Sequence, residues 1–154
     1  MQLTDVINQF HQAYSDHDID ALLAFVAEDV TIQFPTSPES IRGKDSIRPV
    51  WSMVFDTVIP DVRQEILASV TQGRAAACEF IETGTLAVPS SVAESLGLAS
   101  GGRPYSMRMA SFFEFDDEGL IESIRSYWDT GSFADQIGID ISVIRSLQAR
   151  AHAA

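Results

Sequence analysis

The sequence has few of the residues that several common functions require. It contains a single cysteine, Cys78, so no intramolecular disulfide can form. Lysine and arginine number 10 against 22 aspartate and glutamate residues, which gives a formal net charge of −12. A surface of this charge repels nucleic-acid phosphates and anionic lipid headgroups. We therefore expect neither a nucleic-acid partner nor a membrane partner.

Further absences concern bilayers, metals and phosphates. No apolar run approaches the roughly 18 residues needed to cross a bilayer, and the N-terminus lacks the basic and apolar segments of a signal peptide. No histidine, cysteine and carboxylate cluster has metal-ligand spacing, and no glycine-rich phosphate loop occurs. We expect a cytoplasmic protein without a metal or cofactor. Cys78 lies in an apolar run, where a small buried side chain is the expected role.

The length and composition favour one folded domain over residues 1–154. Hydrophobic residues make up 45% of the 154 positions and charged residues 21%, which supports a substantial core. Apolar residues at helical spacing predict helices over residues 3–14, 21–27, 45–59, 131–137 and 139–154. Alternating apolar and polar residues predict strands over residues 30–34, 63–71, 74–86, 105–115 and 119–129. This order predicts an α+β fold with helices gathered against one face of an antiparallel sheet.

The last predicted strand carries the strongest indication of a functional site. With a period of two, one face of this strand would present Ile121, Ser123, Arg125, Tyr127 and Asp129. A cation, a phenol and a carboxylate on an inward face must satisfy one another or a ligand. The pattern therefore indicates a pocket for a small molecule.

Several short motifs, in this order and spacing, resemble the SnoaL-like branch of the NTF2-like superfamily. These motifs are Asp18-Ile-Asp20, Phe25–Val30, Gly43–Ile47, Glu82–Thr85, Gly102–Pro104, Phe115–Ile121, Tyr127-Trp-Asp129, Ser132-Phe133 and Gln136–Gly138. The resemblance spans about residues 5–138 and leaves 139–154 as a C-terminal helical tail. It implies a curved antiparallel sheet with N-terminal helices around a cone-shaped pocket, and a homodimer.

The resemblance also implies roles for the polar residues of the last strand. Asp129 occupies the place of the pocket acid or base of the cyclases and epoxide hydrolases, and Arg125 resembles an arginine of the latter. Tyr127 and Tyr14 could donate hydrogen bonds to a developing oxyanion, and His11 could transfer protons. The structural alternatives are an N-cap for Asp129, sheet packing for Arg125 and Tyr127, a core position for Tyr14 and a surface position for His11.

An apolar pocket lining is expected from residues on the first and third helices and on two strands. These predicted substrate-binding residues are Phe10, Phe34, Trp51, Phe55, Met107, Met109, Ser111 and Phe113. Glu79 and Glu82 lie three apart on one strand and therefore face opposite sides, so one of them can supply an inward carboxylate. The segment 87–102 is too long for a tight hairpin and could be a lid, an oligomer contact or surface decoration.

Two functions of different classes follow from this sequence. The first is a cofactor-independent acid/base enzyme, of cyclase, isomerase, dehydratase or lyase type, acting on a hydrophobic cyclic or aromatic oxygenated small molecule. The second is a non-catalytic binding or dimerisation module, which predicts that Asp129 caps a helix and that side chains fill the cone. Ketosteroid isomerase chemistry is disfavoured by the resemblance, because that branch would need a tyrosine at Phe10, a base at Phe34 and a carboxylic acid near Ser111.

Overall fold

The computed structural model describes residues 1–146, and a six-stranded curved sheet forms its centre. The strands are β1 (Val26–Gln33), β2 (Ile41–Arg42), β3 (Arg63–Gln72), β4 (Ala75–Val88), β5 (Gly101–Phe115) and β6 (Ile121–Tyr127). Their order across the sheet is β2-β1-β6-β5-β4-β3. The predicted α+β class is confirmed. The expectation of a wholly antiparallel sheet is wrong at one pair, because β1 and β6 run parallel.

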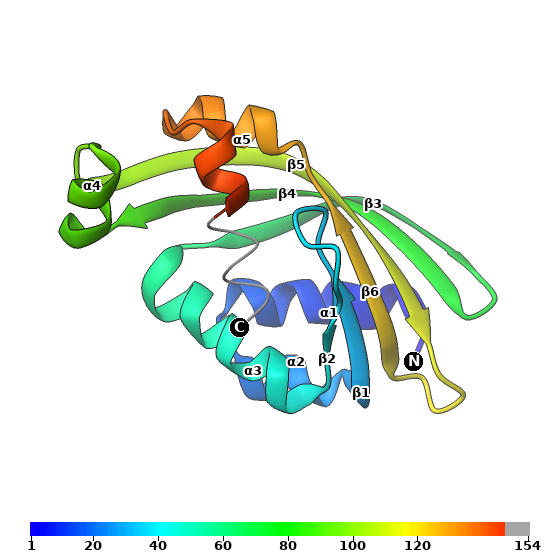
Figure 1. Ribbon diagram of the computed structural model, residues 1–154. Coiled ribbons are helices and arrows are strands. Elements are labelled where there is room, and N and C mark those ends of the chain that lie inside the picture. Colours follow the sequence, from blue (N-terminus) through cyan, green and yellow to red (C-terminus); the bar gives the residue numbers. More distant parts are fainter. Residues whose placement is uncertain (147–154) are drawn as a thin grey trace.

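Three helical segments cover the concave face of the sheet (Figure 1). They are α1 (Leu3–Ser15), α2 (Ile19–Ala24), and α3 (Lys44–Met53) with its π-helical continuation η1 (Val54–Val58). The α1 helix buries Ile7 and Phe10, which recur at helical spacing. The α2 helix begins two residues earlier than predicted, because the Asp18 side chain accepts a hydrogen bond from the Ala21 N–H at 3.0 Å.

The hairpin of β4 and β5 is longer than the sequence pattern indicated. The two strands stay paired as far as Val88 and Gly101, so most of the predicted loop 87–102 is strand or helix. The helical part is the short helix α4 (Ser90–Leu96), which Figure 1 places at the far tip of this hairpin. Ala93 of α4 is buried.

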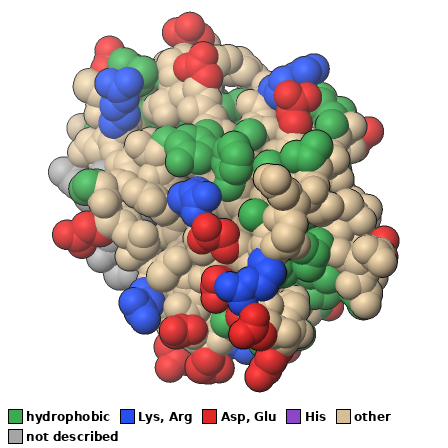
Figure 2. Space-filling view, turned by 90° about the vertical axis from the view of Figure 1, so that its right-hand side faces the viewer, with side chains coloured by type: hydrophobic (Ala, Val, Ile, Leu, Met, Phe, Trp, Pro, Cys, Tyr) green, Lys and Arg blue, Asp and Glu red, His purple; other side chains and the backbone are tan. Residues whose placement is uncertain are grey.

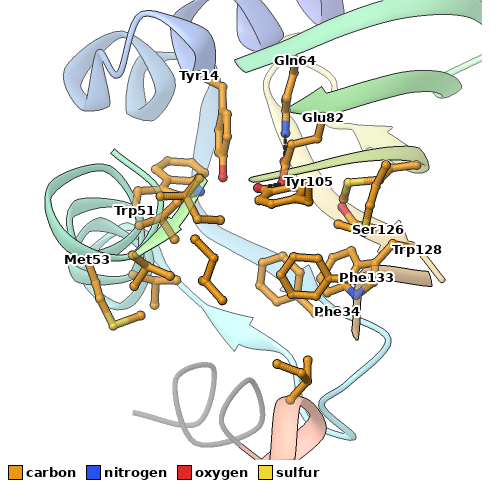
Figure 3. Close-up of a pocket in the computed structure, with 18 of the residues that line it drawn as sticks. Tyr14, Phe34, Trp51, Met53, Gln64, Glu82, Tyr105, Ser126, Trp128 and Phe133 are labelled. Carbon is orange, nitrogen blue, oxygen red and sulfur yellow. Dashed lines mark hydrogen bonds between the residues drawn. The ribbon is translucent and has the colours of Figure 1, made fainter. Parts of the chain in front are cut away.

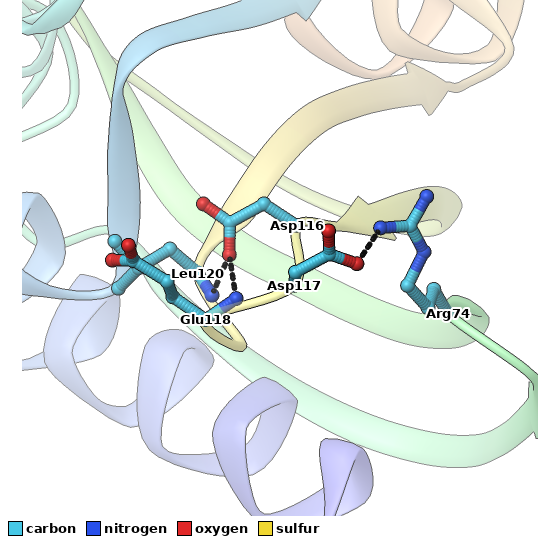
Figure 4. Close-up of polar contacts among 5 residues, drawn as sticks. All are labelled: Arg74, Asp116, Asp117, Glu118 and Leu120. Atoms are coloured by element: carbon cyan, nitrogen blue, oxygen red, sulfur yellow. Dashed lines mark hydrogen bonds and ion pairs between the residues drawn. The ribbon is translucent and has the colours of Figure 1, made fainter.

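The turn between β5 and β6 is held by side-chain hydrogen bonds (Figure 4). Asp116 Oδ1 accepts the N–H groups of Glu118 and Leu120, both at 2.9 Å. Gly119 takes a φ of 82°, a conformation that favours glycine. Arg74 forms an ion pair with Asp117, which ties this turn to the neighbouring one between β3 and β4.

A β-bulge changes which side chains of β6 face inward. Ile121 pairs with Phe115 and Ser123 with Glu114, so β6 advances two residues while β5 advances one. The extra residue, Glu122, shifts the alternation, and Ile124 is buried three positions after Ile121.

The strand β6 leads into the helix α5 (Thr130–Ile137), close to its predicted bounds of 131–137. Residues 141–146 are also helical, within the predicted C-terminal helix from 139, and the rest of that prediction lies outside the described residues. Within residues 1–146, no helix is both long enough and apolar enough to cross a membrane.

Candidate functional site

A cavity of about 510 Å³ lies between the concave face of the sheet and the helices α1, α3 with η1, and α4 (Figure 3). Seven of the eight predicted substrate-binding residues border it: Phe10, Phe34, Trp51, Met107, Met109, Ser111 and Phe113. Phe55 does not border it, because its ring packs behind Tyr14 and stacks on His17, with centroids 4.9 and 4.7 Å apart. A largely apolar cavity of this size fits a drug-sized organic molecule.

Glu82 supplies the one carboxylate among the described residues that line this cavity. It is 8% exposed. Its two oxygens accept hydrogen bonds at 2.8 Å, Oε2 from the Gln64 side-chain amide and Oε1 from the Tyr105 hydroxyl. Burial raises the pKa of Glu82, and the two hydrogen bonds only partly oppose this shift. The sequence left the facing of Glu79 and Glu82 open, and the pairing of Glu82 with the inward Met107 settles it.

Two tyrosines lie near Glu82 and keep their protons. Burial, and then the charge of Glu82, raise the pKa of Tyr14 and of Tyr105 well above the ordinary value for a phenol. Figure 3 shows the Tyr14 hydroxyl pointing toward Glu82 and Tyr105. Gly84 leaves room for this arrangement, because a Cβ there would lie 3.2 Å from the Tyr105 hydroxyl and 2.4 Å from Ile59.

Gln64 is fixed from the side of α1. Its backbone N–H donates to the Ser15 hydroxyl at 2.8 Å, and that hydroxyl donates to the Gln64 carbonyl at 3.2 Å. The amide that contacts Glu82 is therefore anchored at its own backbone. A carboxylate held in this way keeps a defined position in the cavity.

His11 lines the same cavity and is only 4% exposed. The alternative of a surface position for His11 is therefore wrong. Its Nε2 lies 3.4 Å from Cys78 Sγ, and its Nδ1 has no hydrogen-bond partner among the described residues. Burial lowers the pKa of His11 from 6.5 to about 4, an effect that the Gln64 side chain partly opposes. Burial also raises the pKa of the Cys78 thiol to about 12, which fits the predicted role of a small buried side chain.

The prediction that Arg125, Tyr127 and Asp129 face inward is wrong, because the bulge at Glu122 turns this face of β6 away from the cavity. Tyr127 is 50% exposed and packs edge to face on Phe112, on the outer face of the sheet. Arg125 forms an ion pair with Glu114 at 3.4 Å. Asp129 is exposed and caps α5 by accepting the Ser132 N–H at 3.1 Å. None of the three borders the cavity.

Sequence reasoning missed several residues of the cavity, among them Tyr105, Ser126, Trp128 and Gln64. Tyr105 continues the alternation of Met107, Met109, Ser111 and Phe113, so the same period could have found it. Ser126 and Trp128 would have followed from the apolar spacing of Ile121 and Ile124, whereas nothing in the sequence indicates Gln64.

His17 packs at the edge of the same region. Its ring stacks on Phe55, and a ring nitrogen hydrogen-bonds the Val62 carbonyl at 2.9 Å. Among residues 1–146, no group of three or more histidine, cysteine or carboxylate side chains is arranged to hold a metal ion.

The cone of curved sheet and helices defines an NTF2-like fold, and the sequence shows the family. The SnoaL-like domain profile matches residues 7–124, so the chain belongs to the SnoaL-like family. None of the curated proteins matches the sequence.

Solved structures share this fold at low sequence identity. IdmH of Streptomyces antibioticus, a candidate polyketide cyclase, is 22% identical, with 90% of this chain and 100% of that chain covered and a TM-score of 0.74. A candidate polyketide cyclase of Xanthomonas campestris pv. campestris is 22% identical over 88% and 96% of the chains, with a TM-score of 0.73. A hypothetical protein of Catenulispora acidiphila with a ketosteroid isomerase-like fold, in complex with trimethylamine, is 19% identical over 89% and 95%, with a TM-score of 0.70.

Proposed function

We propose that this protein is a cofactor-independent enzyme of the polyketide cyclase type, in which Glu82 is the general base and acid. The observation that carries the proposal is a single buried carboxyl, held by Gln64 and Tyr105 on the wall of an apolar cavity. Membership of the SnoaL-like family supports the class of reaction. A substrate in this cavity would be a hydrophobic, oxygenated ring compound.

The environment of Glu82 suits proton transfer at neutral pH. A carboxylate whose pKa is raised by burial is a stronger base than an ordinary glutamate, and its acid form is more readily populated. Each carboxylate oxygen accepts up to two hydrogen bonds. Because Gln64 and Tyr105 each use one site, both oxygens keep a lone pair that can take a proton.

An intramolecular aldol closure illustrates the chemistry. The Glu82 carboxylate removes a proton from a carbon next to a substrate carbonyl, and the enolate electrons form a carbon–carbon bond to a second carbonyl carbon. The resulting alkoxide takes the proton back from the Glu82 acid, so no proton is gained or lost overall. The Tyr14 hydroxyl, which stays protonated, donates a hydrogen bond to the enolate oxygen. Tyr105 positions Glu82 by its hydrogen bond to Oε1.

Because the natural substrate is not identified, the test uses a model reaction whose rate depends on a base in an apolar cavity. Nitrobenzisoxazole opens to a coloured phenolate when a base removes its ring C–H proton (the Kemp elimination). We expect the wild-type protein to accelerate this opening and Glu82→Gln to lower the rate by about 10²-fold or more. Retention of the wild-type rate by a folded Glu82→Gln variant would remove Glu82 from the mechanism.

Glu79→Gln is the matched control for this experiment. Glu79 lies on the same strand, faces outward and forms an ion pair with Arg108 at 3.2 Å. The substitution makes the same chemical change outside the cavity. We expect it to leave the rate of ring opening unchanged, and a loss equal to that of Glu82→Gln would indicate a general effect of charge.

A non-catalytic binding module is the second candidate, and one observation favours it. That hypothesis predicted that Asp129 caps the following helix, as the hydrogen bond to the Ser132 N–H shows. It also predicted a cone filled by side chains, whereas the cavity has about 510 Å³ of free volume. Saturable ligand binding without any acceleration of ring opening would favour this candidate over the enzyme.

We also propose that the outer face of β5 and β6 pairs with a second copy of this chain. Phe112 and Tyr127 are 44% and 50% exposed there, with rings in edge-to-face contact 5.9 Å apart. The ion pairs of Arg108 with Glu79 and of Arg125 with Glu114 flank them. Figure 2 views the molecule from the side on which β3 and β6 lie in Figure 1, and hydrophobic side chains lie there between charges of both signs. An apolar centre with a charged rim suits a two-fold interface.

A further inference from the structure

Two serine hydroxyls form a second polar place in the cavity. Ser111 of β5 and Ser126 of β6 are direct partners in the sheet, and their hydroxyl oxygens lie 2.8 Å apart. Both residues line the cavity, and Ser111 is 3% exposed. One hydroxyl hydrogen is used between them, and neither hydroxyl makes another hydrogen bond among the described residues. The pair therefore keeps one hydrogen and several lone pairs to offer to a ligand.

This serine pair lies well apart from Glu82 along the sheet. Glu82 pairs with Met107, and Ser111 follows four residues later on β5, which corresponds to about 13 Å at the usual rise of a strand. Met109 and Phe80, which pair with each other, lie between the two polar places and line the cavity. A ligand that contacts both places must extend past these two side chains.

The charges around the cavity restrict the ligand further. Among the residues within 1–146 that line it, none is lysine or arginine. His11 is neutral at neutral pH, because burial lowers its pKa to about 4. The protein as a whole carries a net charge of −12. No group in the described part of the cavity can compensate the charge of a carboxylate or phosphate, so burial of an anion there is unfavourable.

We propose that the substrate is a neutral, elongated ring compound with oxygens at both ends, one bound at Glu82 and the other by the pair Ser111 and Ser126. The assignment of the reacting end to Glu82 rests on the proposed function, whereas the two-ended binding does not. A keto or hydroxyl oxygen suits the serine pair, because it can accept the free hydroxyl hydrogen.

Three biphenyl probes on one skeleton test this proposal. They are para,para′-dihydroxybiphenyl, para-hydroxybiphenyl, and the analogue with one hydroxyl and one carboxylate at the two para ends. Both tryptophans of the chain, Trp51 and Trp128, line the cavity, so a bound ring compound should quench their fluorescence. We expect the dihydroxy probe to bind about tenfold more tightly than the monohydroxy probe. The carboxylate probe should bind at least about tenfold more weakly than the monohydroxy probe.

The double variant Ser111→Ala and Ser126→Ala should bind both neutral probes equally, at the affinity of the monohydroxy probe in the wild type. Ser123→Ala is the matched control on β6, because Ser123 lies opposite Glu114 and does not line the cavity, and it should leave the tenfold preference intact. Equal affinities of the two neutral probes in the wild type overturn the proposal, even if the double variant fails to fold. Tight binding of the carboxylate probe overturns the assignment of a neutral substrate.

The two proposals fail in different measurements. Glu82→Gln retains a hydrogen-bonding group, so it should keep the preference for the dihydroxy probe while it loses acceleration of ring opening. Unchanged ring opening in Glu82→Gln contradicts the proposed function alone. If the wild type does not prefer the dihydroxy probe over the monohydroxy probe, the two-ended substrate alone is contradicted.

Discussion

The buried His11 should make the stability of the protein depend on pH in a window that the structure defines. Burial lowers the pKa of His11 from 6.5 to about 4 in the folded state. Because the unfolded chain takes up the proton near pH 6.5 and the folded protein near pH 4, stability from this group is complete above pH 6.5 and is lost as pH falls to about 4. A shift of about 2.5 units at about 1.4 kcal/mol per unit corresponds to about 3 kcal/mol.

The assay is urea denaturation of the wild type and of His11→Leu at several values of pH. Any constant cost of the substitution cancels, since only the change of the stability difference with pH is compared. Between pH 6.5 and 4 the wild type should lose about 3 kcal/mol relative to His11→Leu. A stability difference that does not change over this window would refute the reasoning. So would an NMR titration of the His11 ring with a midpoint near 6.5.

Three further predictions follow from other residues. Glu82→Gln should stabilise the protein at neutral pH, because burial raises the pKa of Glu82 and its ionisation above pH 4.5 favours the unfolded chain. In urea titrations this gain in stability should disappear as the pH falls toward 4.5. A gain that is independent of pH would contradict the account. Asp129→Ala should cost about 1 kcal/mol in the same assay through loss of the α5 cap, while the rate of ring opening stays unchanged; a lost rate would return Asp129 to the mechanism. Phe112→Asp should convert the proposed dimer to a monomer in sedimentation experiments, and an unchanged mass would place any interface elsewhere.

The fold was predictable because several weak signals agreed. Helical apolar spacing on α1, alternation on β5 and the turn at Asp116–Gly119 each specify a local structure. Their order then matched one known arrangement. The parallel pairing of β1 with β6 was missed, because pairing partners depend on long-range contacts that no local pattern contains.

The candidate site was only partly predictable, and β6 shows why. A period of two, counted from Ile121, placed Arg125 and Tyr127 inward. The bulge at Glu122 reverses that face, because a shift of one residue turns every later side chain of a strand to the other side. The buried pair Ile121 and Ile124, three positions apart, was the available sign of a broken period.

Glu82 illustrates the opposite case, in which the residue was identified and its facing was not. Glu79 and Glu82 are equivalent in the sequence, and only the register of β4 on β5 separates them. Glu82 pairs with the inward Met107, whereas Glu79 pairs with Ala110 and forms an ion pair with Arg108 outside. The partner Gln64 comes from a third strand, so its contact with Glu82 could not be read from local sequence.

The dependence of ring opening on pH tests the central role of Glu82 most directly. Glu82 can remove the proton of nitrobenzisoxazole only in its ionised form, so its contribution to the rate should rise with pH through the pKa of Glu82. Because burial raises that pKa, the midpoint should lie above the ordinary value of 4.5, and this rise should be absent in Glu82→Gln. A rate that is independent of pH, or that has already reached its plateau at pH 4.5, would contradict the assignment of Glu82 as the buried base.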